Sequence, residues 1–146
     1  MPVGDQRPLW ECPECAKRFV TANSWHSCHR GSVDEFFAAR PEALRRTFER
    51  YLEVAESFGP VIVDVARTRI SIQARVRFAG VARMRKDSLI LGFWLKHRIE
   101  SPRFTKVELI PPRNWVYQFA AATPEDVDDE VAGWLASAYE IGMQRV

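Results

Sequence analysis

The sequence predicts an α+β fold: a two-layer sandwich with helices on one face of a five- or six-stranded antiparallel sheet, plus a small N-terminal zinc knuckle. Three observations predict it. All three cysteines and two of the three histidines lie within residues 10–29. Two segments with helical signals follow, and a third closes the chain. Between them lie short strand-like runs whose connections are too short for parallel crossovers, so the sheet must be antiparallel.

The helices are predicted from their start signals and apolar stripes. Ser32 stands three residues before Glu35, the reciprocal capping pattern, and Pro41 suits the first position of a second helix. The last helix is predicted to open at Thr123 and to run nearly to Arg145. The second helix ends at a Gly-Pro pair, and its single apolar stripe consists of Leu44, Phe48, Tyr51, Leu52, Ala55 and Phe58.

The strands are predicted between the second and last helices. Residues 69–78 alternate apolar and polar side chains, which is typical of a strand with one buried and one wet face. Residues 86–87 are expected to form a tight turn, and the apolar run that follows is expected to be central. Pro111 and Pro112 cannot donate to a ladder and must lie in a connection. The other strands are expected at residues 81–85, 88–95, 103–110 and 114–120.

The cysteine segment has the spacing of a structural metal site. Cys12 and Cys15 enclose two residues, and His26 and Cys28 come after ten more. A structural zinc ion takes four nitrogen or sulfur ligands in a tetrahedron, so we assign Zn²⁺ to these four residues. His29 is an alternative ligand that could displace His26. Four protein ligands leave no position for water, so the zinc is predicted to be structural.

Other chemistries fit this segment less well. A redox dithiol normally sits at a strand-to-helix junction, and no long strand precedes Cys12. A deaminase site places its histidine before the cysteine pair, and a DNA-reading finger needs longer spacings. Three unconnected buried thiols are the remaining alternative. The large apolar residues of the segment are only Trp10, Phe19, Val20 and Trp25, so its order would depend on metal binding.

The length of 146 residues suits one domain with a small appendage. We divide the chain into a zinc-binding segment, residues 1–31, and an α+β domain, residues 32–146. No apolar run approaches the ~20 residues that a membrane span needs, and residues 1–10 lack the pattern of a secretory signal. We therefore expect a cytoplasmic protein that makes no membrane contact, with cysteines that are free or bind metal.

Basic residues are concentrated between residues 67 and 113, a segment that contains twelve Lys or Arg but only three Asp or Glu. We expect this segment to bind nucleic acid or another phosphate-bearing ligand through the wet face of the sheet. The alternative is that the charges only keep exposed strand faces from associating. The residues predicted to bind the ligand are Arg69, Arg75, Arg77, Arg83, Arg85 and Trp94.

Several short motifs resemble a known family. In the first segment they are Trp10-x-Cys12-Pro13-x-Cys15, Phe19 and His26-Ser27-Cys28; later they are Phe78-Ala79-Gly80-Val81, Arg85-Lys86-Asp87, Leu91-Gly92-Phe93 and Ser101-Pro102-Arg103. Together they resemble the bacterial family of domains of unknown function 5655, some members of which have an N-terminal zinc-binding segment. The resemblance implies two helices on a five-stranded antiparallel sheet and implies no activity. Ala16 departs from it, because related knuckles more often have a glycine there.

We expect a non-enzymatic binding module, with nucleic acid as the first partner to test. An enzyme or small-molecule binder would instead use Asp64, His97 and Glu100 in a pocket between sheet and helices. No nucleophile elbow, phosphate loop or paired-carboxylate motif accompanies those residues. A protein-interaction adaptor would dock through an apolar patch of Trp25, Val20 and Phe36.

Overall fold

A computed structural model describes residues 8–26, 28 and 31–146. The elements are β1 (Trp10–Glu11), β2 (Arg18–Phe19), α1 (Val33–Phe36), α2 (Glu42–Glu56), β3 (Ile62–Val65), β4 (Ile70–Gln73), β5 (Arg77–Met84), β6 (Leu89–Leu95), β7 (Phe104–Ile110), β8 (Asn114–Ala121), the 3₁₀ turn η1 (Pro124–Asp126) and α3 (Asp129–Gly142).

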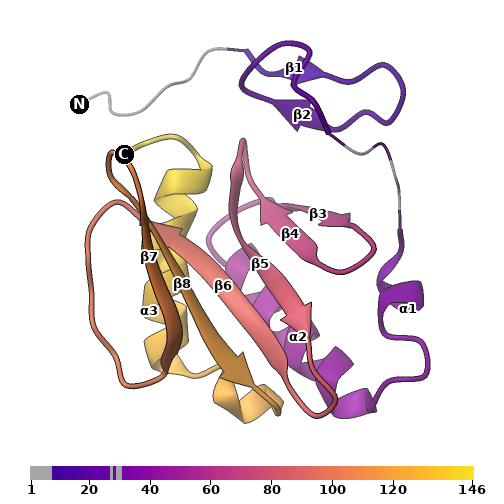
Figure 1. Cartoon of the computed structure of the whole chain (residues 1–146), viewed down its shortest axis with the longest axis vertical. Helices are drawn as coiled ribbons and strands as arrows, with labels where there is room; N and C mark the ends of the chain where they lie inside the picture. Colours follow the sequence, from indigo (N-terminus) through magenta and orange to yellow (C-terminus); the bar gives the residue numbers. More distant parts are fainter. Residues whose placement is uncertain (1–7, 27, 29–30) are drawn as a thin grey trace.

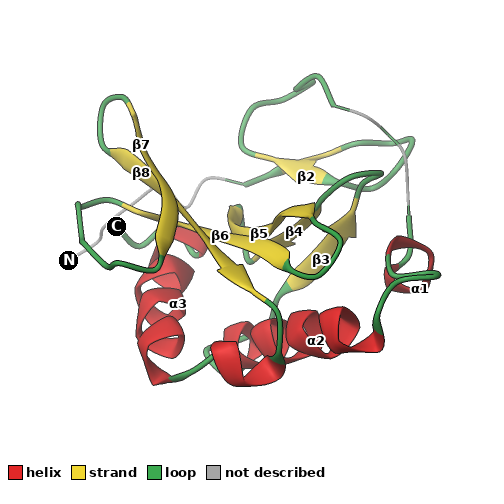
Figure 2. Cartoon of the chain, turned by 60° about the horizontal axis from the view of Figure 1, so that its bottom comes forward, coloured by secondary structure: helices red, strands yellow, loops and turns green. Residues whose placement is uncertain are grey.

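The six longer strands form one antiparallel sheet in the order β3-β4-β5-β6-β8-β7. Helices α2 and α3 pack on one face of this sheet (Figure 1). The pair β1–β2 belongs to a separate N-terminal unit on the other side of the sheet from α2 (Figure 2). The predicted α+β sandwich is confirmed. Within the described ranges, no helix is both long and apolar enough to cross a membrane.

The helix starts follow the predicted signals, with two corrections. The Glu35 N–H donates to Ser32 Oγ at 3.1 Å and begins α1, while Pro41 is the N-cap of α2 rather than its first residue. Thr123 opens only η1, and α3 begins after Asp128, whose side chain accepts from the first turn. The prediction of one helix from Thr123 to near Arg145 is therefore wrong at both ends, because Asp128 is a second N-cap and α3 ends at Gly142.

The prediction of one strand over residues 69–78 is wrong. These residues form β4, a turn at 74–76, and the start of β5. The N–H groups of Arg75 and Val76 both donate to the Gly142 carbonyl, at 2.8 and 3.0 Å, so the turn caps the C-terminal end of α3. A sixth strand, β3, pairs with β4 along the edge, and no prediction had placed a strand there.

A β-bulge at Phe78 decides which way Arg77 points. Gln73 pairs with Arg77 and Ile72 pairs with Ala79, so Phe78 is an extra residue on β5. Phe78 stays fully buried in the core, and the extra residue lets Arg77 emerge on the outer face of the sheet, away from the helices.

Stacked aromatic rings form the centre of the core. Phe93 on β6 stacks on Tyr117 and on Trp134, with ring centroids 5.1 Å apart in both pairs. The Tyr51 hydroxyl donates to the Gly92 carbonyl at 2.7 Å and attaches α2 to the same strand. The apolar run at 89–95 is thus the central strand, as predicted.

Strand β7 forms one edge of the sheet and, among the described residues, pairs only with β8. Most of its length is exposed, including Val107, Leu109 and Ile110, and the ion pair Lys106–Glu108 lies along it. The predicted connection at Pro111 and Pro112 follows directly.

Gly80 provides a test of this packing. An added Cβ would lie 2.1 Å from the Ile70 carbonyl oxygen of the neighbouring strand, so the backbone would have to move. We expect Gly80→Ala to lower the free energy of unfolding by about 3 kcal/mol, the upper end of the range for overpacking. Gly133→Ala is the control, because nothing lies within 4 Å of its Cβ position. That variant should raise the unfolding free energy by up to ~1 kcal/mol. Equal effects in denaturant unfolding would contradict the close approach.

Candidate metal centre and adjoining pocket

Four predicted metal ligands come together in the N-terminal unit. The donor atoms of Cys12, Cys15, His26 and Cys28 all lie within 4.8 Å of one another. The sulfurs of Cys12 and Cys28 are 3.9 Å apart, and His26 Nε2 lies 3.2 Å from Cys15 Sγ and 3.5 Å from Cys28 Sγ. Tetrahedral ligands at zinc-type bond lengths are roughly 3.4–3.8 Å apart, so these separations suit a single ion.

The His26 ring is held in the orientation that a metal ligand needs. Its Nδ1 lies 2.8 Å from the Ser24 carbonyl oxygen, which can only accept, so Nδ1 carries the proton and donates. In the neutral ring, Nε2 then presents its lone pair to the sulfurs. A metal-bound histidine is usually fixed by this kind of outer hydrogen bond, which here also raises the pKa of His26. His29, the alternative ligand, lies outside the described residues.

The thiols differ in how easily they ionise. Hydrogen bonding by the Cys15 backbone N–H lowers the pKa of Cys12 from 9.0 to about 7. The side-chain hydrogen bond with Cys15 raises the pKa of Cys28 to about 11. Cys12 and Cys15 are buried, whereas Cys28 is exposed. A thiolate is therefore available at Cys12 near neutral pH, and an ion must displace the proton of Cys28.

A tight turn brings the first two cysteines together. Ala16 N–H donates to the Cys12 carbonyl and Cys12 N–H donates to the Lys17 carbonyl, both at 2.8 Å. Ala16 has a φ of 63°, the left-handed region that glycine adopts without strain. This is the position at which the resemblance described in the sequence analysis leads us to expect a glycine.

Two aromatic rings, those of Trp10 and Phe19, pack beside the four donors. Phe19 lies 4.5 Å from the His26 ring and 6.0 Å from Trp10, centroid to centroid. Trp10 and Phe19 also pair across β1 and β2. We call the unit formed by residues 10–26 and 28 the knuckle.

The knuckle contacts the main sheet at the β3 edge. Lys17 Nζ lies 3.3 Å from Asp64 Oδ1, and only 15% of the Lys17 side chain is exposed. The N–H of Gly31, which follows the knuckle, donates to the Val65 carbonyl at 3.0 Å. The knuckle is therefore joined to the sheet by an ion pair and by a backbone hydrogen bond in the following segment.

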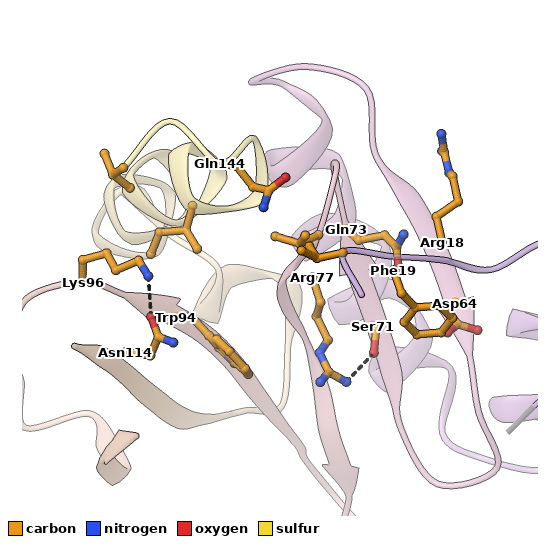
Figure 3. Close-up of a pocket in the computed structure, with 14 residues that line it drawn as sticks. Arg18, Phe19, Asp64, Ser71, Gln73, Arg77, Trp94, Lys96, Asn114 and Gln144 are labelled. Carbon is orange, nitrogen blue, oxygen red and sulfur yellow. Dashed lines mark hydrogen bonds between the residues drawn. The ribbon is translucent and has the colours of Figure 1, made fainter. Parts of the chain in front are cut away.

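A pocket of about 470 Å³ lies where the knuckle, the outer face of the sheet and the end of α3 meet (Figure 3). Arg18 and Phe19 line it from the knuckle, and Gln144 lines it from beyond α3. Its volume is within the range of small-molecule sites. It lies at the outer face of the sheet and reaches α3 only at the C-terminal end of that helix, so it is not the pocket between sheet and helices that the sequence analysis predicted.

Arg77 and Trp94 lie side by side in the pocket (Figure 3). The guanidinium carbon is 5.7 Å from the Trp94 ring centroid, and Nη1 donates to Ser71 Oγ at 3.5 Å. Arg77 stays accessible to solvent, yet its partial burial, reinforced by the charge of Arg69, lowers its pKa. No carboxylate among the described residues forms an ion pair with Arg77.

Lys96 and Asn114 line the pocket on the other side of Trp94. Lys96 Nζ donates to Asn114 Oδ1 at 2.7 Å. The acidic side chain in the lining is Asp64, whose carboxylate is already paired with Lys17. The lining side chains therefore combine an aromatic ring with an excess of positive charge.

Of the six predicted ligand residues, Arg77 and Trp94 line this pocket. Arg75 is directed to the end of α3, where its Nε donates to Gln144 Oε1 at 3.0 Å. The turn at 74–76 and the bulge at Phe78 separate it from its neighbours in sequence. The other three predicted arginines, Arg69, Arg83 and Arg85, are exposed and do not line the pocket.

The pocket residues that sequence reasoning missed include Arg18, Lys96 and Asn114. Lys96 had a usable signal, because it stands two residues after Trp94 and so shares its face of the strand. Arg18 and Asn114 had no such signal in the sequence. Arg18 reaches the pocket through the docking of the knuckle, and Asn114 reaches it through the pairing of β8.

The residues considered for an enzyme do not form one cluster. Asp64 lines the pocket, but His97 and Glu100 do not, and both are exposed in the loop after β6. The His97 carbonyl accepts a hydrogen bond from the Tyr117 hydroxyl at 2.9 Å, which holds this loop on β8.

The residues considered for an adaptor surface are divided. Trp25 is 94% exposed and Val20 is 42% exposed, both on the knuckle. Phe36 instead packs on the core, with its ring 5.1 Å from that of Phe37. The three residues therefore do not form one exposed apolar patch.

A known protein family matches most of the chain. A family described as a domain of unknown function (DUF5655) matches residues 33–142, which contain the six-stranded sheet and helices α1, α2 and α3. The cysteine cluster lies outside the matched residues. No curated protein and no solved structure matches the chain.

The left-handed residue in the cysteine turn can be tested by substitution. Because a side chain in this conformation costs about 1–2 kcal/mol, Ala16→Gly should raise metal affinity by roughly fivefold or more, measured by competition with a chelator. Ala39 has the same conformation, with a φ of 57°, in the loop before α2. Ala39→Gly is therefore the matched control. It should stabilise the α+β domain of residues 32–146, which we call the main domain, without changing metal affinity. The same metal affinity in Ala16→Gly and wild type would contradict the strain at this turn.

Proposed function

The chain belongs to the DUF5655 family through residues 33–142, and we propose that it is a zinc-clipped binding module for small phosphate-bearing anions. Zn²⁺ would be held by Cys12, Cys15, His26 and Cys28. The anion would lie in the pocket beside Arg77, Trp94 and Lys96. The observation that carries this proposal is the position of Arg77, which forms no ion pair among the described residues, in a pocket whose acidic side chain, Asp64, is paired with Lys17.

Zinc suits the donor set better than other common ions. Three thiolates and one imidazole are soft and borderline ligands, which disfavour Mg²⁺ and Ca²⁺, and four donors in a tetrahedron form a closed structural site. The chemistry that zinc supplies here is folding free energy, because it holds together a segment whose strands are two residues long.

A phosphate-bearing anion suits the pocket for three reasons. Arg77 offers several N–H donors in a plane, a shape that matches phosphate oxygens. Its desolvation and the nearby Arg69 both disfavour its positive charge, and a bound anion would offset both effects. The Trp94 ring beside it provides a flat surface for an aromatic part of the ligand.

Metal content tests the first half of the proposal. We expect purified protein to contain one zinc per chain, measured by elemental analysis. A strong chelator should remove it and release Trp10 and Phe19 from their packing, seen as a change in tryptophan fluorescence. The unfolding transition of the main domain should persist, because its core lies within residues 37–139. Metal-free native protein would contradict the zinc site.

Phenyl phosphate binding tests the second half. We expect Arg77→Gln to weaken binding by roughly ten- to a hundredfold, since hydrogen bonds to charged groups contribute about 1.5–3 kcal/mol. Arg83→Gln makes the same charge change on the same strand outside the pocket, and it should bind as wild type does. Isothermal titration measures both. Equal weakening by the two variants would show a diffuse charge effect and overturn the pocket site.

Nucleic acid is distinguished in the same assay by its salt dependence. A single strand that contacts three or more phosphates should bind with a log–log salt slope of at least ~2 in magnitude. Oligonucleotide binding with such a slope, weakened as much by Arg83→Gln and Arg85→Gln as by Arg77→Gln, would overturn the pocket site. It would indicate an extended nucleic-acid-binding surface instead.

A further inference from the structure

We infer that the knuckle forms one side of the anion pocket and contributes to anion affinity, so that metal binding and anion binding strengthen each other. This inference rests on the proposed function and adds regulation to it: the affinity for a phosphate-bearing ligand depends on the metal occupancy of the cysteine cluster. Three contacts carry the inference, one through an aromatic ring and two through charge.

Phe19 belongs to both sites at once. Its ring packs 4.5 Å from the ring of the metal ligand His26, and the same side chain lines the pocket. Strand β2, which carries it, has two residues, and within the described part of the chain it pairs only with β1, which also has two. An isolated hairpin of this size is not stable in water, so the position of Phe19 depends on the metal cluster.

Lys17 controls the charge of the pocket. Its ion pair with Asp64, at 3.3 Å, neutralises the carboxylate in the pocket lining. If the knuckle loses its order, Lys17 leaves and Asp64 becomes an unpaired negative charge beside the anion site. An anion would then be repelled by a group that the metal-bound state keeps neutralised.

Arg18 adds to the same effect. It lies between Lys17 and Phe19 in β2 and lines the pocket from the knuckle. Release of the knuckle would therefore remove a lining cation as well as the partner of Asp64. Both changes lower anion affinity, and Arg77 and Trp94 would remain in place because they lie on the main sheet.

The experiment compares the full chain loaded with zinc and the same chain stripped of metal and kept reduced. Phenyl phosphate should bind the loaded protein about tenfold more tightly or better, within the usual range for coupling between two sites. By reciprocity, saturating phenyl phosphate should raise zinc affinity by the same factor in chelator competition. Cobalt substitution provides the control, since an unchanged thiolate–cobalt spectrum on adding phenyl phosphate shows that the probe does not bind the metal.

Variants separate the effect of the Lys17–Asp64 charges on anion binding from the effect of losing the ordered knuckle. Lys17→Gln keeps all four metal ligands and should weaken phenyl phosphate binding even in the zinc-loaded protein. Asp64→Asn removes the carboxylate, so adding it to Lys17→Gln should restore much of the binding. These variants also keep the test decisive if the stripped protein loses more structure than the knuckle.

The outcomes distinguish the two proposals. No phenyl phosphate binding to zinc-loaded protein would overturn the anion site and the linkage together. Equal affinity in loaded and stripped protein, with Arg77→Gln still weakening both, would overturn the linkage and leave the anion site standing. Lys17→Gln binding as tightly as wild type would overturn the role of the ion pair.

Discussion

The N-terminal unit depends on one constraint: its four donor atoms must be held together, because little else in it can supply order. Cys12 and Cys15 are its only buried residues among those described. Its two strands are two residues long, and its aromatic cluster packs on a candidate metal ligand, His26. The main domain is different, since stacked rings around Phe93 form a continuous core. The chain thus joins a unit with a candidate metal site and little buried surface to a domain with a continuous apolar core, and the pocket lies at their junction.

Much of the fold and the metal cluster could be predicted from sequence because their signals are local. The apolar stripe of α2, the capping pair Ser32–Glu35 and the apolar run of β6 each specify a structure within a few residues. The Cys-x-x-Cys pair works in the same way, because its spacing brings two sulfurs to one point. The family match over residues 33–142 agrees with the motifs of the main domain.

The pocket could not be predicted, because its residues meet through tertiary contacts. The alternation of apolar and polar side chains over residues 69–78 continues through the turn at 74–76. The pattern therefore gave no sign that the chain reverses direction at Arg75. The Gly142 carbonyl, far along the chain, fixes that turn. The bulge at Phe78 then turns Arg77 outward, and Arg18 arrives with the knuckle. A row of arginines was therefore expected, whereas the structure places only Arg77 of the five in the pocket.

Strand β7 has a consequence for how the protein behaves at high concentration. No strand of the described residues pairs with its outer backbone groups, and Val107 and Leu109 are 37% and 42% exposed along it. An open rim of this kind favours self-association by strand addition. Lys106 and Glu108 place charges on the same strand and oppose it. Two residues that belong to neither the core nor the pocket thus help to keep the molecules apart, and exchanging both for apolar side chains would make the protein prone to aggregate.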